Sequence, residues 1–125
     1  MSTGADDMAE YEAIARTVQH YIDGARAGSG AVMKAAFHED AWIFGYARDG
    51  LFAAPIRQLF DRVDKTGPAP ETEARIVAID VAGTVATVRL ELDRWAGRRF
   101  TDCFTLVKID GTWTIVNKVF HLHNP

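Results

Sequence analysis

The chain has 125 residues, of which 48% are hydrophobic and 25% are charged, and its formal net charge is −3. These values are typical of a globular protein that buries a core, and they exclude a disordered chain. No basic cluster exceeds the pair Arg98 and Arg99, so we expect no binding to nucleic acid, which needs a surface that neutralises phosphates.

The sequence also limits the compartment. No apolar run approaches the roughly 20 residues of a membrane span, and the acidic N-terminal segment lacks the apolar core of a signal peptide. A single cysteine, Cys103, cannot form an internal disulfide. We therefore expect a cytoplasmic protein without membrane association, folded as one domain over residues 1–125, in which residues 1–7 are flexible.

The N-terminal part of the chain predicts two helices. The first begins near Asp6 or Asp7, whose carboxylates suit a helix N-terminus, and ends near Ala27. Its apolar residues recur at steps of three and four: Tyr11, Ile14, Ala15, Val18, Ile22 and Ala25. A second helix over Ala31–Phe37 follows, with Ser29 as its N-cap.

A strand, a turn and a third helix come next. The β-branched and aromatic run Asp40–Tyr46 predicts a strand, and Leu51–Ala53 predicts a short second strand. Pro55 suits the first position of a helix, and the third helix ends before Thr66–Pro70, whose prolines cannot continue it. The buried stripe of this helix comprises Ile56, Leu59, Phe60 and Val63.

From Glu71 onward, alternating apolar and polar residues predict four antiparallel strands in a meander. The turns between them fall at Ala82-Gly83, at Trp95-Ala96-Gly97 and at Asp110-Gly111. The three helices must cover one face of a single curved sheet, which defines an α+β fold.

The second of these turns decides which residues face each other. A three-residue loop over Trp95-Ala96-Gly97, with Gly97 left-handed, places Leu90 opposite Asp102. A two-residue Ala-Gly turn would instead place Glu91 opposite Asp102 and so pair two like charges. We therefore predict the longer loop.

Two charged residues fall on the face of the sheet that is predicted to be buried. Asp102 shares a face with Phe100 and Phe104, and Lys118 shares a face with Phe120. An isolated buried carboxylate is costly, so it must find a partner or stay protonated. Either the two residues form a buried ion pair, or together they hold a polar group of a ligand at the floor of an apolar pocket.

Aromatic residues at helix, turn and inward strand positions are the candidates for lining such a pocket: Phe52, Phe60, Trp95 and Phe120. On the first strand, one face carries aromatic residues: Trp42, Phe44 and Tyr46. The convex face of the sheet carries small and moderately polar residues that suit packing in a homodimer: Thr101, Cys103, Thr105, Val107 and Val119.

The histidines and the cysteine give no catalytic or metal motif. His121 and His123 lie two apart on a strand, are predicted to face outward and lack a third ligand. His38 is predicted at a helix C-terminus and His20 beside the buried stripe of the first helix. Cys103 is predicted to be a small packed residue. No phosphate-binding or dinucleotide motif is present, so we expect neither a metal nor a cofactor.

Four segments carry a resemblance to a known family: Tyr21–Gly28, Phe37–Tyr46, Gly50–Ile56 and Trp95–His121. Together with the order of elements, they resemble the nuclear transport factor 2-like superfamily, which includes SnoaL-like cyclases, ketosteroid isomerase and scytalone dehydratase. Within it they are most similar to the putative lumazine-binding branch. The resemblance implies a cone-shaped α+β fold, a pocket between the concave sheet face and the helices, and dimerisation through the convex face.

The resemblance to ketosteroid isomerase implies roles for two residues. Asp102 stands at the strand position of the isomerase's oxyanion-hole aspartic acid, and Tyr21 matches its hydrogen-bond-donating tyrosine. The position of the isomerase's general base holds Gly45, which carries no proton acceptor. Steroid-type isomerisation by that mechanism is therefore not expected.

These observations leave three hypotheses. The leading one is a small-molecule-binding protein with an apolar pocket, whose ligand-binding residues are Tyr21, Phe52, Phe60, Trp95, Asp102, Phe104, Lys118 and Phe120. An alternative is a SnoaL-like or ketosteroid-isomerase-like enzyme without a cofactor, an isomerase, dehydratase or cyclase that uses Asp102 and Tyr21. The third is a structural or interaction module with a closed core, in which Asp102 and Lys118 satisfy each other.

Overall fold

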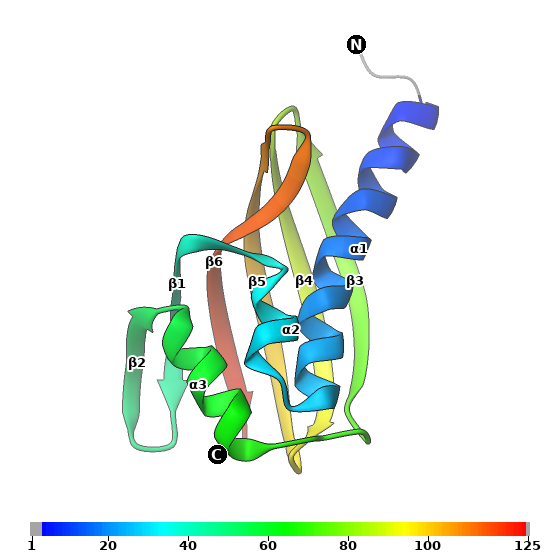
Figure 1. The fold of residues 1–125 in the computed structure, drawn as a ribbon. Helices are drawn as coiled ribbons and strands as arrows, with labels where there is room; N and C mark the ends of the chain where they lie inside the picture. Colours follow the sequence, from blue (N-terminus) through cyan, green and yellow to red (C-terminus); the bar gives the residue numbers. More distant parts are fainter. Residues whose placement is uncertain (1–3, 125) are drawn as a thin grey trace.

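The computed structural model describes residues 4–124, which form three helices and one six-stranded sheet. The helices are α1 (Gly4–Ala27), α2 (Gly30–Lys34) and α3 (Arg57–Thr66), and the strands are β1 (Phe37–Ala47), β2 (Gly50–Pro55), β3 (Glu73–Ala82), β4 (Val85–Trp95), β5 (Arg98–Ile109) and β6 (Thr112–His123). All three helices lie on one face of the curved sheet (Figure 1), so the predicted α+β cone is confirmed. Residues 1–3 and 125 lie outside the described part, and the flexibility expected for residues 1–7 stays a prediction.

The strands are arranged in the order β2-β1-β6-β5-β4-β3. The meander from β3 to β6 is antiparallel, as predicted, and so is the pair of β1 and β2. The sheet is mixed because β1 runs parallel to β6, a pairing that alternation along the chain does not specify. This pairing places Ile43 beside Lys118 and Gly45 beside Phe120, which brings the first strand to the inward charged residues.

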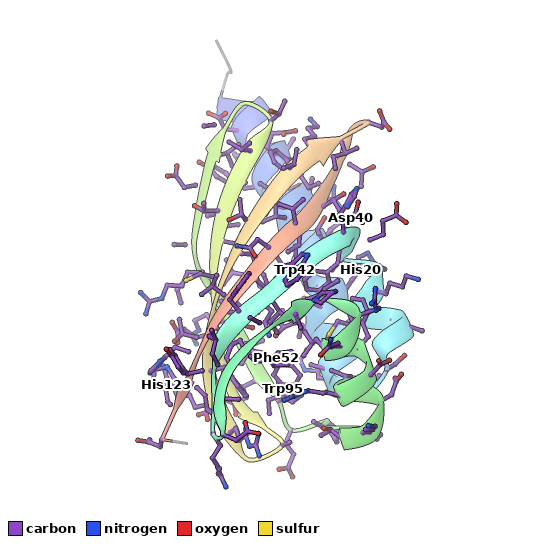
Figure 2. All side chains as sticks on the ribbon, turned by 90° about the vertical axis from the view of Figure 1, so that its left-hand side faces the viewer. His20, Asp40, Trp42, Phe52, Trp95 and His123 are labelled. Carbon is purple, nitrogen blue, oxygen red and sulfur yellow. The ribbon has the colours of Figure 1, made fainter. Side chains whose placement is uncertain are left out.

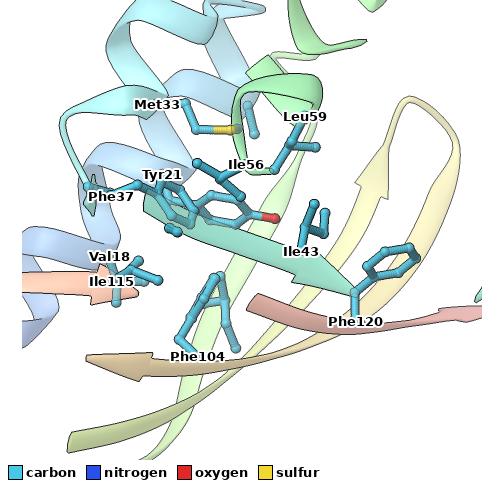
Figure 3. Close-up of a cluster of buried hydrophobic side chains, with 14 of the residues drawn as sticks. Val18, Tyr21, Met33, Phe37, Ile43, Ile56, Leu59, Phe104, Ile115 and Phe120 are labelled. Atoms are coloured by element: carbon cyan, nitrogen blue, oxygen red, sulfur yellow. The ribbon is translucent and has the colours of Figure 1, made fainter. Parts of the chain in front are cut away.

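The core lies between the helices and the concave face of the sheet. In α1 the buried stripe begins at Ile14. Tyr11, which was predicted to belong to this stripe, is 40% exposed. Tyr21 reaches from α1 towards the sheet (Figure 3) and packs edge-on against Phe37 and Phe104. Within residues 4–124, no helix is long and apolar enough to cross a membrane.

Two predicted helix boundaries are wrong. Helix α2 ends at Lys34, and Phe37 instead begins β1, where it pairs with Ile115. His38 consequently lies in β1 and not at a helix C-terminus. Pro55 is the last residue of β2, paired with Trp42, and not the first residue of α3. In both places tertiary pairing with a neighbouring strand overrides the local helix signal.

The turn between β4 and β5 keeps the predicted register with a different backbone. Leu90 faces Asp102, as expected. The loop, however, has two residues, Ala96 and Gly97, whose φ angles are 51° and 80°. A bulge between Leu92 and Trp95, where Arg94 has a φ of 57°, adds the residue that keeps Glu91 away from Asp102.

Candidate functional site

Asp102 and Lys118 both point into the protein, as strand alternation predicts. Asp102 on β5 is fully buried and Lys118 on β6 is 2% exposed. Tyr21 on α1, also fully buried, lies between the helices and these two strands. We refer to Tyr21, Asp102 and Lys118 as the buried triad.

The triad is held together by one strong hydrogen bond and one long ion pair. The Tyr21 hydroxyl donates to Asp102 Oδ2 over 2.6 Å. Lys118 Nζ lies 3.9 Å from Asp102 Oδ1, which is beyond hydrogen-bond distance. Among residues 4–124, Asp102 Oδ1 has no hydrogen-bond partner, and Lys118 Nζ donates no hydrogen bond.

Aromatic rings surround the lysine amine. Nζ lies 5.2 Å from the ring centroid of Tyr21, 5.2 Å from that of Phe120 and 5.7 Å from that of Trp95. These distances allow cation–π attraction, which favours the ammonium. The rings also exclude water from the amine, which disfavours its charged form.

Burial sets the protonation equilibria of the triad. It raises the pKa of Asp102, while the Lys118 charge and the Tyr21 hydrogen bond act in the opposite direction. It lowers the pKa of Lys118, against the attraction of the Asp102 carboxylate. Burial and the neighbouring Asp102 carboxylate raise the pKa of Tyr21 well above its ordinary value. Desolvation therefore pushes both Asp102 and Lys118 towards their neutral forms.

A pocket of about 380 Å³ opens beside the triad, between α3 and the sheet. This volume falls within the roughly 300–1,000 Å³ range of small-molecule pockets. Two of its aromatic walls, Phe52 from β2 and Trp95 from the end of β4, can be followed in Figure 2. The lining consists of Ile43, Ala47, Phe52, Leu59, Arg62, Val63, Lys65, Thr66, Trp95, Ala96, Arg98, Phe100, Lys118, Phe120 and Leu122.

The structure brings half of the predicted ligand-binding residues into this pocket. Four of them line it: Phe52, Trp95, Lys118 and Phe120. The other four, Tyr21, Phe60, Asp102 and Phe104, are buried outside the lining. Phe60 packs against Phe37 instead. Of the buried triad, therefore, Lys118 alone reaches the pocket, and Asp102 lies behind it.

The rim of the pocket carries three exposed cations that the sequence analysis did not single out: Arg62, Lys65 and Arg98. None of them forms an ion pair within residues 4–124, and no acidic residue lines the pocket. The Arg62 guanidinium lies 4.0 Å from the ring centroid of Phe52. The sequence held one signal for Arg62: it follows Leu59 by three residues, so both project from the same side of α3.

Gly45 is glycine because Phe120 occupies the space beside it. A Cβ at position 45 would lie 2.5 Å from the Phe120 ring and 2.5 Å from the Phe120 carbonyl oxygen. The position that matches the isomerase's general base therefore has no room for a carboxylate.

The outer face of the sheet carries three rows of uncharged residues across β1, β6 and β5: Trp42–Asn117–Thr105, Phe44–Val119–Cys103 and Tyr46–His121–Thr101. We call these nine residues the outer patch. Trp42, Phe44 and Tyr46 are 44%, 39% and 72% exposed. Cys103 is exposed and not packed, contrary to expectation. His121 and His123 face outward, as expected, and no cluster of three metal ligands occurs among residues 4–124.

The fold and the pocket define a protein of the nuclear transport factor 2-like class, and solved structures agree. An NTF2-like protein of unknown function from Methylobacillus flagellatus KT is 46% identical, with a TM-score of 0.89 and coverage of 92% of this chain and 93% of that chain. Another, from Shewanella baltica OS155, is 38% identical, with a TM-score of 0.91 and full coverage of both chains.

The family is set by sequence. Residues 9–121 match the family described as "Putative lumazine-binding", and the chain belongs to that family. A relative from Cladobotryum sp., Aldolase FrzH, is 34% identical over 113 residues, which cover 90% of each chain.

Proposed function

We propose that the protein binds a small, mainly apolar molecule that presents an oxygen acceptor, a carbonyl or a carboxylate, to Lys118. The observation that carries the proposal is that the buried Lys118 lines the pocket, while its Nζ has no hydrogen-bond acceptor within 3.5 Å among residues 4–124. A buried donor without an acceptor costs about 1–3 kcal/mol. A ligand oxygen that accepts from Nζ removes this cost, and the aromatic walls supply the apolar contact.

The positively charged rim of the pocket favours a ligand that carries a negative charge at the end away from Lys118. Arg62, Lys65 and Arg98 concentrate positive charge at the pocket mouth of a chain whose net charge is −3. An exposed cation contributes modestly to binding but attracts anions to the opening. The preferred ligand is therefore an aromatic or other ring compound with a carboxylate.

Ligand-dependent thermal stabilisation tests this proposal. A ligand at 100 times its dissociation constant stabilises the fold by about 2.7 kcal/mol. We expect phenylpropionate to raise the melting temperature more than phenylpropanol, which has the same skeleton and no charge. Arg62→Gln on α3 reduces this difference, whereas the matched control Arg57→Gln, which is outside the lining, does not. The proposal fails if neither these acids nor flavins, pterins, steroids or polyketides stabilise the protein.

A second candidate function is carbon–carbon bond chemistry at a carbonyl group. It is supported by the relative named Aldolase FrzH and by a lysine in the pocket with a carboxylic acid behind it. Acid–base work on a carbonyl needs a positioned proton donor and acceptor. In this candidate, Asp102 and Tyr21 act through Lys118, because neither lines the pocket.

We also propose that the outer patch packs against a second copy of this chain. The patch has no Asp, Glu, Lys or Arg across three adjacent strands, and charge depletion with exposed aromatic residues is the composition of an interface core. A patch on one sheet face can pair with itself about a two-fold axis. The pocket, on the opposite face, stays open in such a dimer.

A further inference from the structure

The environment of Lys118 differs from that of a lysine that serves only as an ion-pair partner. A buried ion pair is stable when its geometry is close and the remaining donors and acceptors are satisfied. Here the Nζ–Oδ1 distance is 3.9 Å, Oδ1 is unpartnered within residues 4–124, and Nζ donates no hydrogen bond there. The amine therefore lies beside the carboxylate without a hydrogen bond to it, and Lys118 lines the pocket.

We infer that Lys118 is a nucleophile that forms an imine with a ketone or aldehyde group of a molecule bound in the pocket. The inference rests on the proposed function, because the carbonyl compound must first enter the pocket. It deepens that function by naming the substrate class: apolar carbonyl compounds, and above all keto acids, whose carboxylate the rim cations attract.

Nucleophilic attack requires the neutral amine. Burial among three aromatic rings lowers the pKa of Lys118 and so enlarges the neutral fraction at neutral pH. The charged and titratable groups around it act in both directions. The Asp102 carboxylate on β5 favours the ammonium form of Lys118. The Tyr21 hydroxyl on α1 donates its hydrogen bond to Asp102. The rim cations on α3 and the β4–β5 turn disfavour the ammonium form by repulsion.

The step balances without an oxidant or reductant. The Nζ lone pair forms a bond to the carbonyl carbon, and the π electrons move to the carbonyl oxygen. Nζ loses one proton to Asp102 Oδ1, the unpartnered acceptor 3.9 Å away, and this proton passes to the alkoxide oxygen to give a carbinolamine. The nitrogen lone pair then forms the C=N bond as the C–O bond breaks, and the second N–H proton passes through Asp102 to the departing hydroxide, which leaves as water. One amine and one carbonyl give one imine and one water.

Reductive trapping on the wild-type protein tests this step. The probe is phenylpyruvate with cyanoborohydride at pH 7, and phenyllactate, which lacks the ketone, is the matched control compound. We expect a single adduct with the mass of the probe minus water plus two hydrogens, mapped by peptide mass spectrometry to Lys118. Because burial lowers the pKa of Lys118 and so enlarges its neutral fraction, Lys118 is expected to react faster than the exposed Lys34.

Two variants complete the design. We expect Lys34→Met to retain the adduct and Lys118→Met to lose it. The peptide map of the wild-type protein locates the adduct without either variant, so the test remains valid even if Lys118→Met does not fold. An adduct that is absent from Lys118, or spread over exposed lysines, overturns the inference. In that case thermal stabilisation by phenyllactate and phenylpropionate shows that binding survives, and its absence shows that the proposed function has failed as well.

Discussion

The hydrogen bond from Tyr21 to Asp102 can be removed by deleting a single oxygen. Tyr21→Phe keeps the buried ring and its edge-on contacts with Phe37, Trp95 and Phe104. It leaves Asp102 without any hydrogen bond among residues 4–124, because Oδ1 already lacks one. No sizeable cavity forms, so the loss of stability reports on the hydrogen bond.

The size of the loss depends on the protonation of Asp102. A hydrogen bond to a charged group contributes about 1.5–3 kcal/mol, and one between neutral groups about 0.5–1.5 kcal/mol. Burial raises the folded-state pKa of Asp102 above its unfolded value, so the folded state binds more protons and its stability falls as pH rises through this window. Removing the Tyr21 donor raises that pKa further. The destabilisation by Tyr21→Phe is therefore expected to grow from about 1 kcal/mol at a low pH, where Asp102 is protonated, to about 2 kcal/mol at a high pH, where it is ionised.

Urea unfolding followed by circular dichroism at both pH values measures this difference. Tyr11→Phe is the matched control, since Tyr11 is on the same helix, is 40% exposed and is expected to change stability by less than about 0.5 kcal/mol. An equal loss at both pH values would refute the assignment of the acceptor as a titrating carboxyl. A loss below about 0.5 kcal/mol at the high pH would refute the hydrogen bond itself.

Three further outcomes are expected. The pH profile of phenylpyruvate trapping at Lys118 has a lower midpoint than that of exposed lysines, and Asp102→Asn lowers it further because the carboxylate holds the pKa of Lys118 up; an upward shift would contradict this sign. Gly45→Ala destabilises the fold by roughly 1–3 kcal/mol in thermal unfolding, since its Cβ meets Phe120 at 2.5 Å, and a neutral result would contradict that contact. Val119→Asp in the outer patch converts a dimer to a monomer in sedimentation, whereas Val77→Asp, of similar exposure on the edge strand β3, does not; a wild-type monomer would remove the dimer proposal.

The sequence was sufficient for the α+β class and the antiparallel meander, because the signals that specify them are local and periodic. A strand turns every second side chain to the same face, so the inward direction of Asp102 and Lys118 follows from their neighbours alone. The facing pair Leu90 and Asp102 follows from a penalty on like charges. That argument chose the correct register with the wrong loop, because a bulge at Arg94 achieves the same register with a two-residue turn.

The candidate site was only partly predictable, because the distance of a buried side chain from the pocket depends on tertiary packing. Alternation tells that Asp102 and Lys118 share the concave side, and it does not tell which of them reaches the pocket. The rim cations were missed for a related reason: Arg62 and Arg98 are exposed and look like ordinary surface residues until α3 and the β4–β5 turn meet at one opening. The parallel pairing of β1 with β6 joins segments more than seventy residues apart and has no local signal.

The buried acid near this pocket is on β5 and not on β1. Phe120 fills the space beside Gly45, so the first strand contributes no carboxylate to the pocket. The fully buried acid Asp102 lies outside the pocket lining, and its Oδ1 is 3.9 Å from the amine of Lys118, which is in the lining. Lys118 is then the buried polar residue of the pocket lining, beside the exposed cations of the rim, and burial lowers the pKa of its amine. The proposed chemistry at electrophilic carbon and at acceptor oxygens follows from this lining, which contains no acidic residue among residues 4–124.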